Sequence, residues 1–244
     1  MRATLAIAGR EFRSYFYSPL AYVVICVGLF LLGVFFFLFR GGFWQIDRAS
    51  CDRLVQFGAW GLCLFIVPVI TMRLLAEEKR SGTLEMLITL PVRDSEVIIG
   101  KYLGALGLVA VLLAGTALYP IFMFCWPWNL GVLDPGPVIS GYVGLLLFAS
   151  ASIAIGLMIS ALSESQTVAF FITFVVLLVL QNLSAIGTIA SGPIGESLRV
   201  LSFDTNMSQF ARGLIDTRNV IYFLSIAGLC LIVAFRSLES RKWS

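Results

Sequence analysis

Few side chains in this 244-residue chain could do acid–base or metal chemistry. The sequence contains no histidine, the side chain that most often serves as a general base or a metal ligand. The cysteines are scattered without the paired spacing of a metal site, at Cys26, Cys51, Cys63, Cys125 and Cys230. The P-loop motif G-x-x-x-x-G-K-[ST] does not occur, so no segment can hold ATP phosphates in that manner. We therefore expect no catalytic residue, no metal site and no directly bound cofactor.

The densest run of charge lies at residues 77–91, between two long apolar runs. Leu84, Leu87 and Ile88 are spaced as i, i+3 and i+4, which puts them on one face of a helix. Pro91 cannot continue that helix. The pattern predicts a short amphipathic helix whose apolar face enters a groove on a soluble partner; the alternative is a loop helix that rests on lipid. The residues expected at this contact are Glu77, Glu78, Lys79, Arg80, Gly82, Thr83, Leu84, Glu85, Leu87, Ile88 and Pro91.

Two neighbouring amides, Gln181 and Asn182, lie inside a long apolar run. An amide in hydrocarbon must find hydrogen-bond partners, so both side chains are expected to face the helix bundle or a lumen. Bonding between helices is the simpler interpretation, and contact with a transported substrate is the alternative.

The elements that must position these residues are predicted to be membrane-spanning helices. The chain is 59% hydrophobic and 13% charged, whereas about a quarter of the residues of a soluble domain are charged. We predict an all-α polytopic membrane protein, a single domain over residues 1–244. Its six transmembrane helices are predicted at about 20–39, 55–72, 97–124, 138–162, 167–189 and 220–235.

Two further features refine the predicted spans. Pro68 lies inside the second span and predicts a kink there. Residues 190–219 contain the breakers Gly192 and Pro193 but remain partly apolar. We predict that this external segment is partly helical or re-entrant.

The N-terminal segment, residues 1–18, is predicted to be an amphipathic helix in the membrane interface. The alternative is a solvated basic leader. One side of its helical wheel collects Arg2, Arg10, Arg13, Ser14 and Tyr17. The other side collects Leu5, Ala8, Phe12, Tyr15 and Phe16.

Small residues spaced by four predict close packing between helices. They are Gly100 and Gly104 in the third span, and Ser152, Gly156 and Ser160 in the fourth.

The distribution of lysine and arginine predicts the orientation of the chain. Eleven lie on the side of the N-terminus, residues 77–91 and the C-terminus, against six on the other side. The positive-inside rule then puts both termini in the cytoplasm. Lys101, near the start of the third span, is expected to extend to the headgroups rather than to form a buried ion site.

The charged segment resembles a known family. Glu78-Lys79-Arg80-Ser81-Gly82-Thr83-Leu84-Glu85, followed by Leu90-Pro91-Val92 and Gly100-Lys101, is similar to the signature loop of ABC-2 type ABC transporter permeases. The resemblance implies a six-span subunit whose coupling helix, between spans two and three, seats in a separate ATPase subunit that binds ATP-Mg. It also implies, within the lipid membrane, a second copy of this chain or a homologous permease or auxiliary membrane subunit. Residues 210–223 and 239–243 are similar to the gliding-motility (GldF-like) subfamily.

These observations predict a transport subunit, not an enzyme, in a bacterial cytoplasmic (inner) membrane. The expected function is to couple ATP hydrolysis by the partner to export of a substrate. The alternative is a membrane anchor or scaffold for mechanical signalling or gliding-type machinery. The net charge of +3 gives no support for nucleic-acid binding. Because deep polar residues are few, a lipid-linked, hydrophobic or polymeric substrate is easier to accommodate than a small hydrophilic one.

Overall fold

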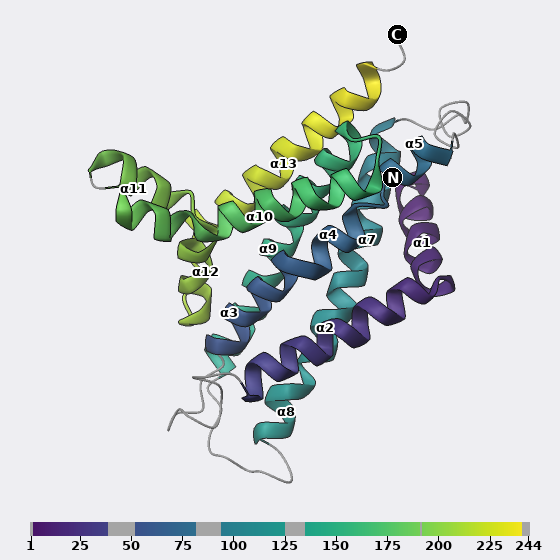
Figure 1. Cartoon of the computed structure of the whole chain (residues 1–244). Coiled ribbons are helices and arrows are strands. Elements are labelled where there is room, and N and C mark those ends of the chain that lie inside the picture. Colours follow the sequence, from purple (N-terminus) through teal and green to yellow (C-terminus); the bar gives the residue numbers. More distant parts are fainter. Residues whose placement is uncertain (1, 39–51, 82–93, 125–134, 191, 241–244) are drawn as a thin grey trace.

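A computed structural model describes residues 2–38, 52–81, 94–124, 135–190 and 192–240. Over these residues all regular structure is helical (Figure 1), which confirms the predicted all-α class. The first part of the chain forms α1 (Arg2–Tyr17), α2 (Pro19–Leu38), α3 (Asp52–Gly61), η2 (Leu62–Ile66), α4 (Val67–Thr71), α5 (Ala76–Ser81), α7 (Asp94–Thr116) and α8 (Leu118–Phe124). The second part forms α9 (Pro135–Leu162), α10 (Gln166–Ile189), α11 (Pro193–Val200), α12 (Phe203–Ala211) and α13 (Thr217–Ser240).

Within the described residues, five helical stretches are long and apolar enough to cross a membrane. They are Leu54–Arg80, Asp94–Ile121, Pro135–Leu162, Gln166–Ile189 and Thr217–Glu239. The bent pair α1 and α2, whose axes differ by 76°, is a sixth candidate. The predicted polytopic membrane protein is therefore confirmed.

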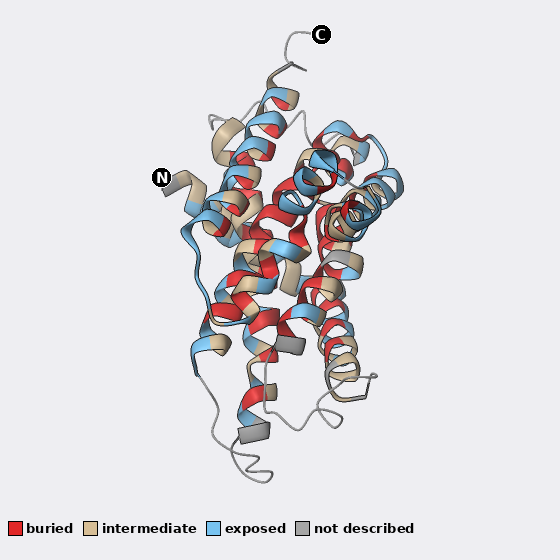
Figure 2. Cartoon of the chain, turned by 90° about the vertical axis from the view of Figure 1, so that its left-hand side faces the viewer, coloured by how far each residue is buried: buried red, intermediate tan, exposed pale blue. Residues whose placement is uncertain are grey.

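Helix α9 forms the centre of the bundle, and α10 and α13 lie at its outside. In the most apolar stretch of α9, 78% of the residues are buried, against 22% in each of α10 and α13. Figure 2 shows the buried residues gathered along the inner helices. The outer helices expose large apolar side chains such as Phe171 and Leu229. Such faces suit lipid or another membrane subunit.

The second span is irregular around Pro68, the residue at which a kink was predicted. The π-helical turn η2 ends two residues before Pro68, which is the second residue of α4. Proline has no N–H to donate to the carbonyl four residues earlier, and a π-helical turn accommodates such a loss. Residues 72–75 then form a turn that separates α4 from α5.

The third predicted span, 97–124, is also interrupted. Helix α7 ends at Thr116 and α8 begins at Leu118. Pro120 cannot donate a backbone hydrogen bond to the carbonyl of Thr116, which explains a break at this position.

The segment before the last span forms two short helices, α11 and α12, which confirms that it is partly helical. Gly192 precedes α11 with φ of 98°, a conformation that glycine adopts without strain, and Pro193 opens the helix. Helix α12 packs against α9, α10 and α3. Its fully buried Phe203 contacts Phe148 of α9 and Phe223 of α13, with ring centroids 5.3 and 5.6 Å apart.

Helix α1 packs lengthwise against the first half of α7. Ile7 meets Gly100, and Phe12 meets Gly107, so the two helices run parallel. A Cβ added at Gly104 would lie 2.9 Å from the Cβ of Glu11, which shows how closely the helices approach. The aromatic face of α1 therefore contacts protein, and its position relative to the membrane interface stays a prediction.

One apolar residue of the predicted wheel is exposed in this structure. Leu5 was expected beside Phe12 and Phe16, but its side chain is 68% exposed. The residues that meet the glycines of α7 are Ile7, Ala8, Glu11 and Phe12, all further along α1 than Leu5.

Candidate functional site

The candidate functional site is the junction at which the charged segment leaves the second span. Glu77, Glu78, Lys79 and Arg80 lie in α5. The remaining expected contact residues, Gly82, Thr83, Leu84, Glu85, Leu87, Ile88 and Pro91, lie outside the described residues. The amphipathic helix predicted there stays a prediction.

Helix α5 is held at its start by α9. The hydroxyl of Ser160 accepts hydrogen bonds from the backbone N–H groups of Leu75 and Ala76, each at 3.1 Å. The first N–H groups of a helix have no partner within the helix, so a buried hydroxyl at this position satisfies them. The turn at 72–75 is stabilised at the same time.

The end of α9 is also tied to α5 through Lys79. Its ammonium donates to the backbone carbonyl of Ala161 and to that of Ser163, the latter at 3.4 Å. The last carbonyls of a helix carry partial negative charge, so a lysine ammonium stabilises this terminus.

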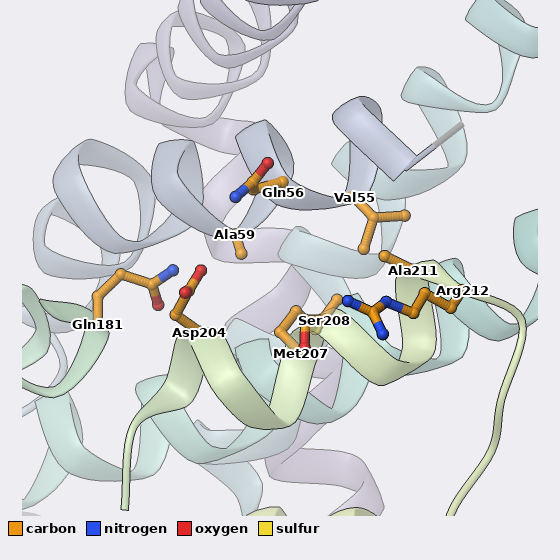
Figure 3. Close-up of a pocket in the computed structure, with 9 residues that line it drawn as sticks. All are labelled: Val55, Gln56, Ala59, Gln181, Asp204, Met207, Ser208, Ala211 and Arg212. Atoms are coloured by element: carbon orange, nitrogen blue, oxygen red, sulfur yellow. The ribbon is translucent and has the colours of Figure 1, made fainter. Parts of the chain in front are cut away.

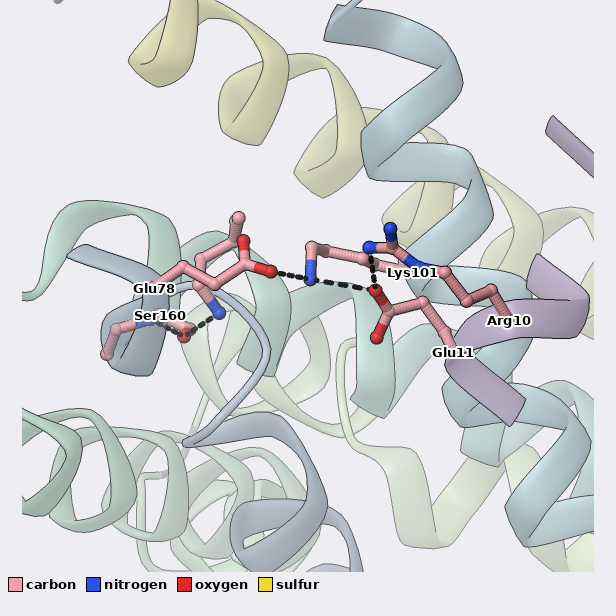
Figure 4. Close-up of polar contacts among 7 residues, drawn as sticks. Arg10, Glu11, Glu78, Lys101 and Ser160 are labelled. Carbon is pink, nitrogen blue, oxygen red and sulfur yellow. Dashed lines mark hydrogen bonds and ion pairs between the residues drawn. The ribbon is translucent and has the colours of Figure 1, made fainter. Parts of the chain in front are cut away.

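Lys101 connects three helices at this junction. Its ammonium lies 2.7 Å from a carboxylate oxygen of Glu78 in α5 and 3.3 Å from one of Glu11 in α1. Figure 4 shows the ammonium between the two carboxylates. The Lys101 side chain is only 3% exposed, while those of Glu11 and Glu78 are 16% and 20% exposed. The expectation that Lys101 reaches the headgroups is wrong, because α1 covers it and supplies a carboxylate.

More charge surrounds this cluster. Arg10 lies 3.5 Å from Glu11, and Arg73 lies 3.9 Å from Glu77 one helical turn away. An open cavity of about 540 Å³ adjoins these side chains. Its lining consists of Arg10, Glu11, Ser14, Tyr15, Ser18, Arg73, Leu74, Glu77, Glu78 and Lys101.

The small residues predicted for close packing lie at this junction and beside it. Gly100 and Gly104 lie against α1, as described above. Gly156 lies against Thr71 of α4, where an added Cβ would come to 2.6 Å from the Thr71 Cβ. Ser160 bonds α5, and Ser152 is fully buried one turn before Gly156.

The two sides of the N-terminal helix differ in burial. Arg10 and Arg13 are exposed, whereas Phe12 and Phe16 are half-buried with ring centroids 5.0 Å apart. Arg2 begins α1, and its side chain lies outside the described part of the structure.

The two amides of the fifth span have different environments. Gln181 is 2% exposed and lines a separate pocket between α3, α10 and α12. Asn182 is half-buried and donates a 2.8 Å hydrogen bond to the carbonyl of Leu178 in its own helix. The described residues contain no group of three or more acidic or cysteine side chains arranged to hold a metal ion.

The sequence analysis did not predict the role of Glu11 or the burial of Lys101, although the position of each residue on its helix indicates it. Glu11 lies on the helical face that Ala8, Phe12 and Tyr15 share, so an acid there calls for a buried partner. Lys101 lies three residues before Gly104 and four after Val97, on the stripe of α7 that α1 covers.

Two comparisons with known proteins bear on this arrangement. A search among curated proteins finds no match to the chain. A family model described as ABC-2 family transporter protein matches residues 5–226. The match extends from α1 through the charged segment and into α13, and so includes the whole junction. The chain therefore belongs to the ABC-2 transporter family, as a multi-pass membrane permease subunit of an ABC transporter.

Proposed function

We propose that this permease exports a substrate with energy from a separate ATPase subunit, which docks on residues 77–91 and holds the ATP-Mg. A second copy of this chain, or a homologous permease, completes the transport path. Membership of the ABC-2 family supports an ATPase partner in general. The observation that carries the docking position is the Lys101 cluster, which joins α5, the helix that ends at Ser81, to α7, the helix that begins at Asp94.

The cluster explains how movement at the docking segment would reach the spans. Residues 82–93 leave α5 and enter α7, and the Glu78–Lys101 pair joins these two helices at 2.7 Å. Glu11 adds α1 to the same pair, and Lys79 and Ser160 add α9. A displacement of the segment by the ATPase would therefore move α1, α7 and α9 together rather than bend a loop.

Transport is favoured over a scaffold role by the pocket at Gln181. A buried amide that lines a polar cavity suits a path for a substrate better than a dry interface between subunits. We further propose that the protein lies in a bacterial cytoplasmic membrane with both termini in the cytoplasm, because of the distribution of lysine and arginine. The sequence of residues 210–223 and 239–243 supports kinship with the GldF-like subfamily.

Co-purification tests the docking position. The variant Leu84→Asp with Leu87→Asp puts two charges on the apolar face predicted to enter the ATPase groove. We expect it to insert in the membrane but to lose co-purification with the co-expressed ATPase, because a buried charge without a partner is costly.

The matched control carries the same chemical change outside residues 77–91. Leu214→Asp with Ile215→Asp changes two exposed residues between α12 and α13, 62% and 57% exposed, and should leave the complex intact. A complex that survives the first double variant would refute the proposed docking position.

A further inference from the structure

A polar pocket lies between α12, α3 and α10, away from the junction at α5. We call it the α12 pocket; its volume is about 210 Å³. Gln181, Val55 and Ala59 are buried at its floor, whereas Gln56 and Arg212 are exposed at its rim. A cavity of this volume suits a small polar headgroup rather than a whole lipid.

Gln181 is the residue in this pocket that calls for a ligand. Its side-chain oxygen is buried and has no hydrogen-bond partner within the described part of the chain. An unsatisfied buried acceptor is costly, so a donor that enters the pocket would gain a strong hydrogen bond. Figure 3 shows the Gln181 amide directed toward the Asp204 carboxylate.

The pocket has opposite charges at its two ends. Asp204, Ser208 and Arg212 are spaced by four along α12 and its C-terminal cap, so they share one face, with about 12 Å between the first and last Cα atoms. Burial raises the pKa of the Asp204 carboxyl, and a hydrogen bond from Ser184 partly opposes this rise. In Figure 3 the Arg212 guanidinium extends toward Ser208 from the opposite end.

The helix dipole gives a simpler reason for part of this pattern. An acid in the first turn of α12 and a base at its C-cap both complement the dipole. That reason does not involve Gln181, which belongs to α10 and carries the buried acceptor. A ligand must therefore donate hydrogen bonds at the Gln181–Asp204 end and present an anion at the Arg212 end.

We propose that the α12 pocket binds an aminophosphate group, with its primary ammonium between Gln181 and Asp204 and its phosphate at Arg212. The ammonium would satisfy the side-chain oxygen of Gln181 and the carboxylate of Asp204, and the guanidinium would bind the phosphate oxygens. Either a phosphatidylethanolamine-type headgroup or a free phosphoethanolamine has this chemistry. The claim that an aminophosphate is the transported substrate rests on the proposed transport function. The claim that the pocket binds one does not.

The test measures binding to the purified full-length permease in detergent, after removal of co-purified lipid, by native mass spectrometry. The probes are short-chain phosphatidylethanolamine, short-chain phosphatidylglycerol, which has the phosphate without the amine, and soluble O-phosphoethanolamine. We expect phosphatidylethanolamine to bind at least about tenfold more tightly than phosphatidylglycerol. Equally tight binding of O-phosphoethanolamine would assign the site to the free compound, and weaker binding would assign it to the lipid.

Variants identify the pocket as the place of binding. Gln181→Leu, Asp204→Asn and Arg212→Gln should each weaken aminophosphate binding by about tenfold. Arg199→Gln, an exposed arginine of α11 outside the pocket, should not. Because Arg212 is exposed at the rim, its variant remains informative if a substitution at the floor prevents folding.

Two results would overturn the inference: equal binding of phosphatidylethanolamine and phosphatidylglycerol, or binding that none of the three pocket variants weakens. The assay contains no ATPase. If the permease binds aminophosphates but its complex with the ATPase survives the Leu84→Asp, Leu87→Asp variant, the proposed docking is refuted and the pocket stands. If the variant loses the ATPase but the pocket binds no aminophosphate, only the pocket is refuted.

Discussion

Lys101 is a buried cation at a position where an apolar residue could have packed. Two carboxylates from different helices make this burial tolerable, because a charge removed from water needs a partner at short distance. A buried ion pair adds little net stability compared with an apolar replacement of the whole cluster. Its value here lies in the geometry, since the three charges fix the relative positions of α1, α5 and α7.

Removal of the cation alone should be destabilising. Lys101→Met leaves Glu11 and Glu78 facing each other with little exposure to water, and we expect a loss of roughly 3 kcal/mol in the free energy of unfolding. Addition of Glu11→Gln and Glu78→Gln should recover much of that loss. Thermal unfolding in detergent measures both effects.

The exposed pair Arg236–Glu239 provides the control, with side chains 74% and 40% exposed. Arg236→Ala should cost less than about 1 kcal/mol, as is usual for surface ion pairs. A Lys101→Met protein as stable as the wild type would show that the cluster does not hold the helices together.

Asp204 predicts a dependence of stability on pH. Burial raises the pKa of its carboxyl above the usual 3.8, so the folded protein holds this proton more tightly than the unfolded chain does. Ionisation therefore costs stability, and the cost appears as pH rises through the raised pKa. Asp204→Asn cannot ionise, and its melting temperature relative to wild type should be higher at about pH 8 than at about pH 4. A difference that stays constant or reverses would contradict the assigned environment.

At the scale of helices, close approach at glycine positions sets the packing of the bundle. Gly156 brings α9 against α4, and Gly144 of α9 brings it against Phe210 of α12. At Gly156 an added Cβ would lie within 2.3 Å of the Thr71 hydroxyl oxygen. No side chain fits there unless the second span moves away from α9.

A pair of glycine substitutions tests this packing. Gly156→Ala should destabilise the protein by about 1–3 kcal/mol, because overpacking forces neighbouring groups apart. Gly228→Ala, in α13, has no atom within 4 Å of the added Cβ and should be neutral or stabilise by up to about 1 kcal/mol, since alanine favours a helix. The comparison is made by thermal unfolding in detergent. Equal effects at both positions would contradict the close approach of α9 and α4.

The long helices and the irregularity near Pro68 were predictable from the sequence, and the contacts between helices were not. A bilayer demands long apolar runs, so α9, α10 and α13 follow from hydropathy alone. The turn at 72–75 depends on a tertiary partner, the Ser160 hydroxyl of α9, which no local pattern reveals. Lys101 was misjudged for the same reason, because its burial is produced by α1, some 90 residues earlier in the chain.

At the scale of the whole molecule, the charged junction and the α12 pocket are formed by different sets of helices. The junction joins α1, α5, α7 and α9 through polar contacts, and the pocket lies between α3, α10 and α12. The second span contributes to both, with α5 at the junction and α3 at the pocket. The Leu54–Arg80 stretch therefore connects the junction to the pocket through the turn at 72–75 and the π-helical turn η2.

Photo-crosslinking in cells tests this account most directly. A benzoyl-phenylalanine side chain at position 87 should crosslink to a protein whose peptides contain a G-x-x-x-x-G-K-[ST] motif, and the same side chain at the exposed position 214 should not. Crosslinks from position 87 to lipid alone, or to the P-loop protein equally from both positions, would contradict the central claim that residues 77–91 dock the ATPase.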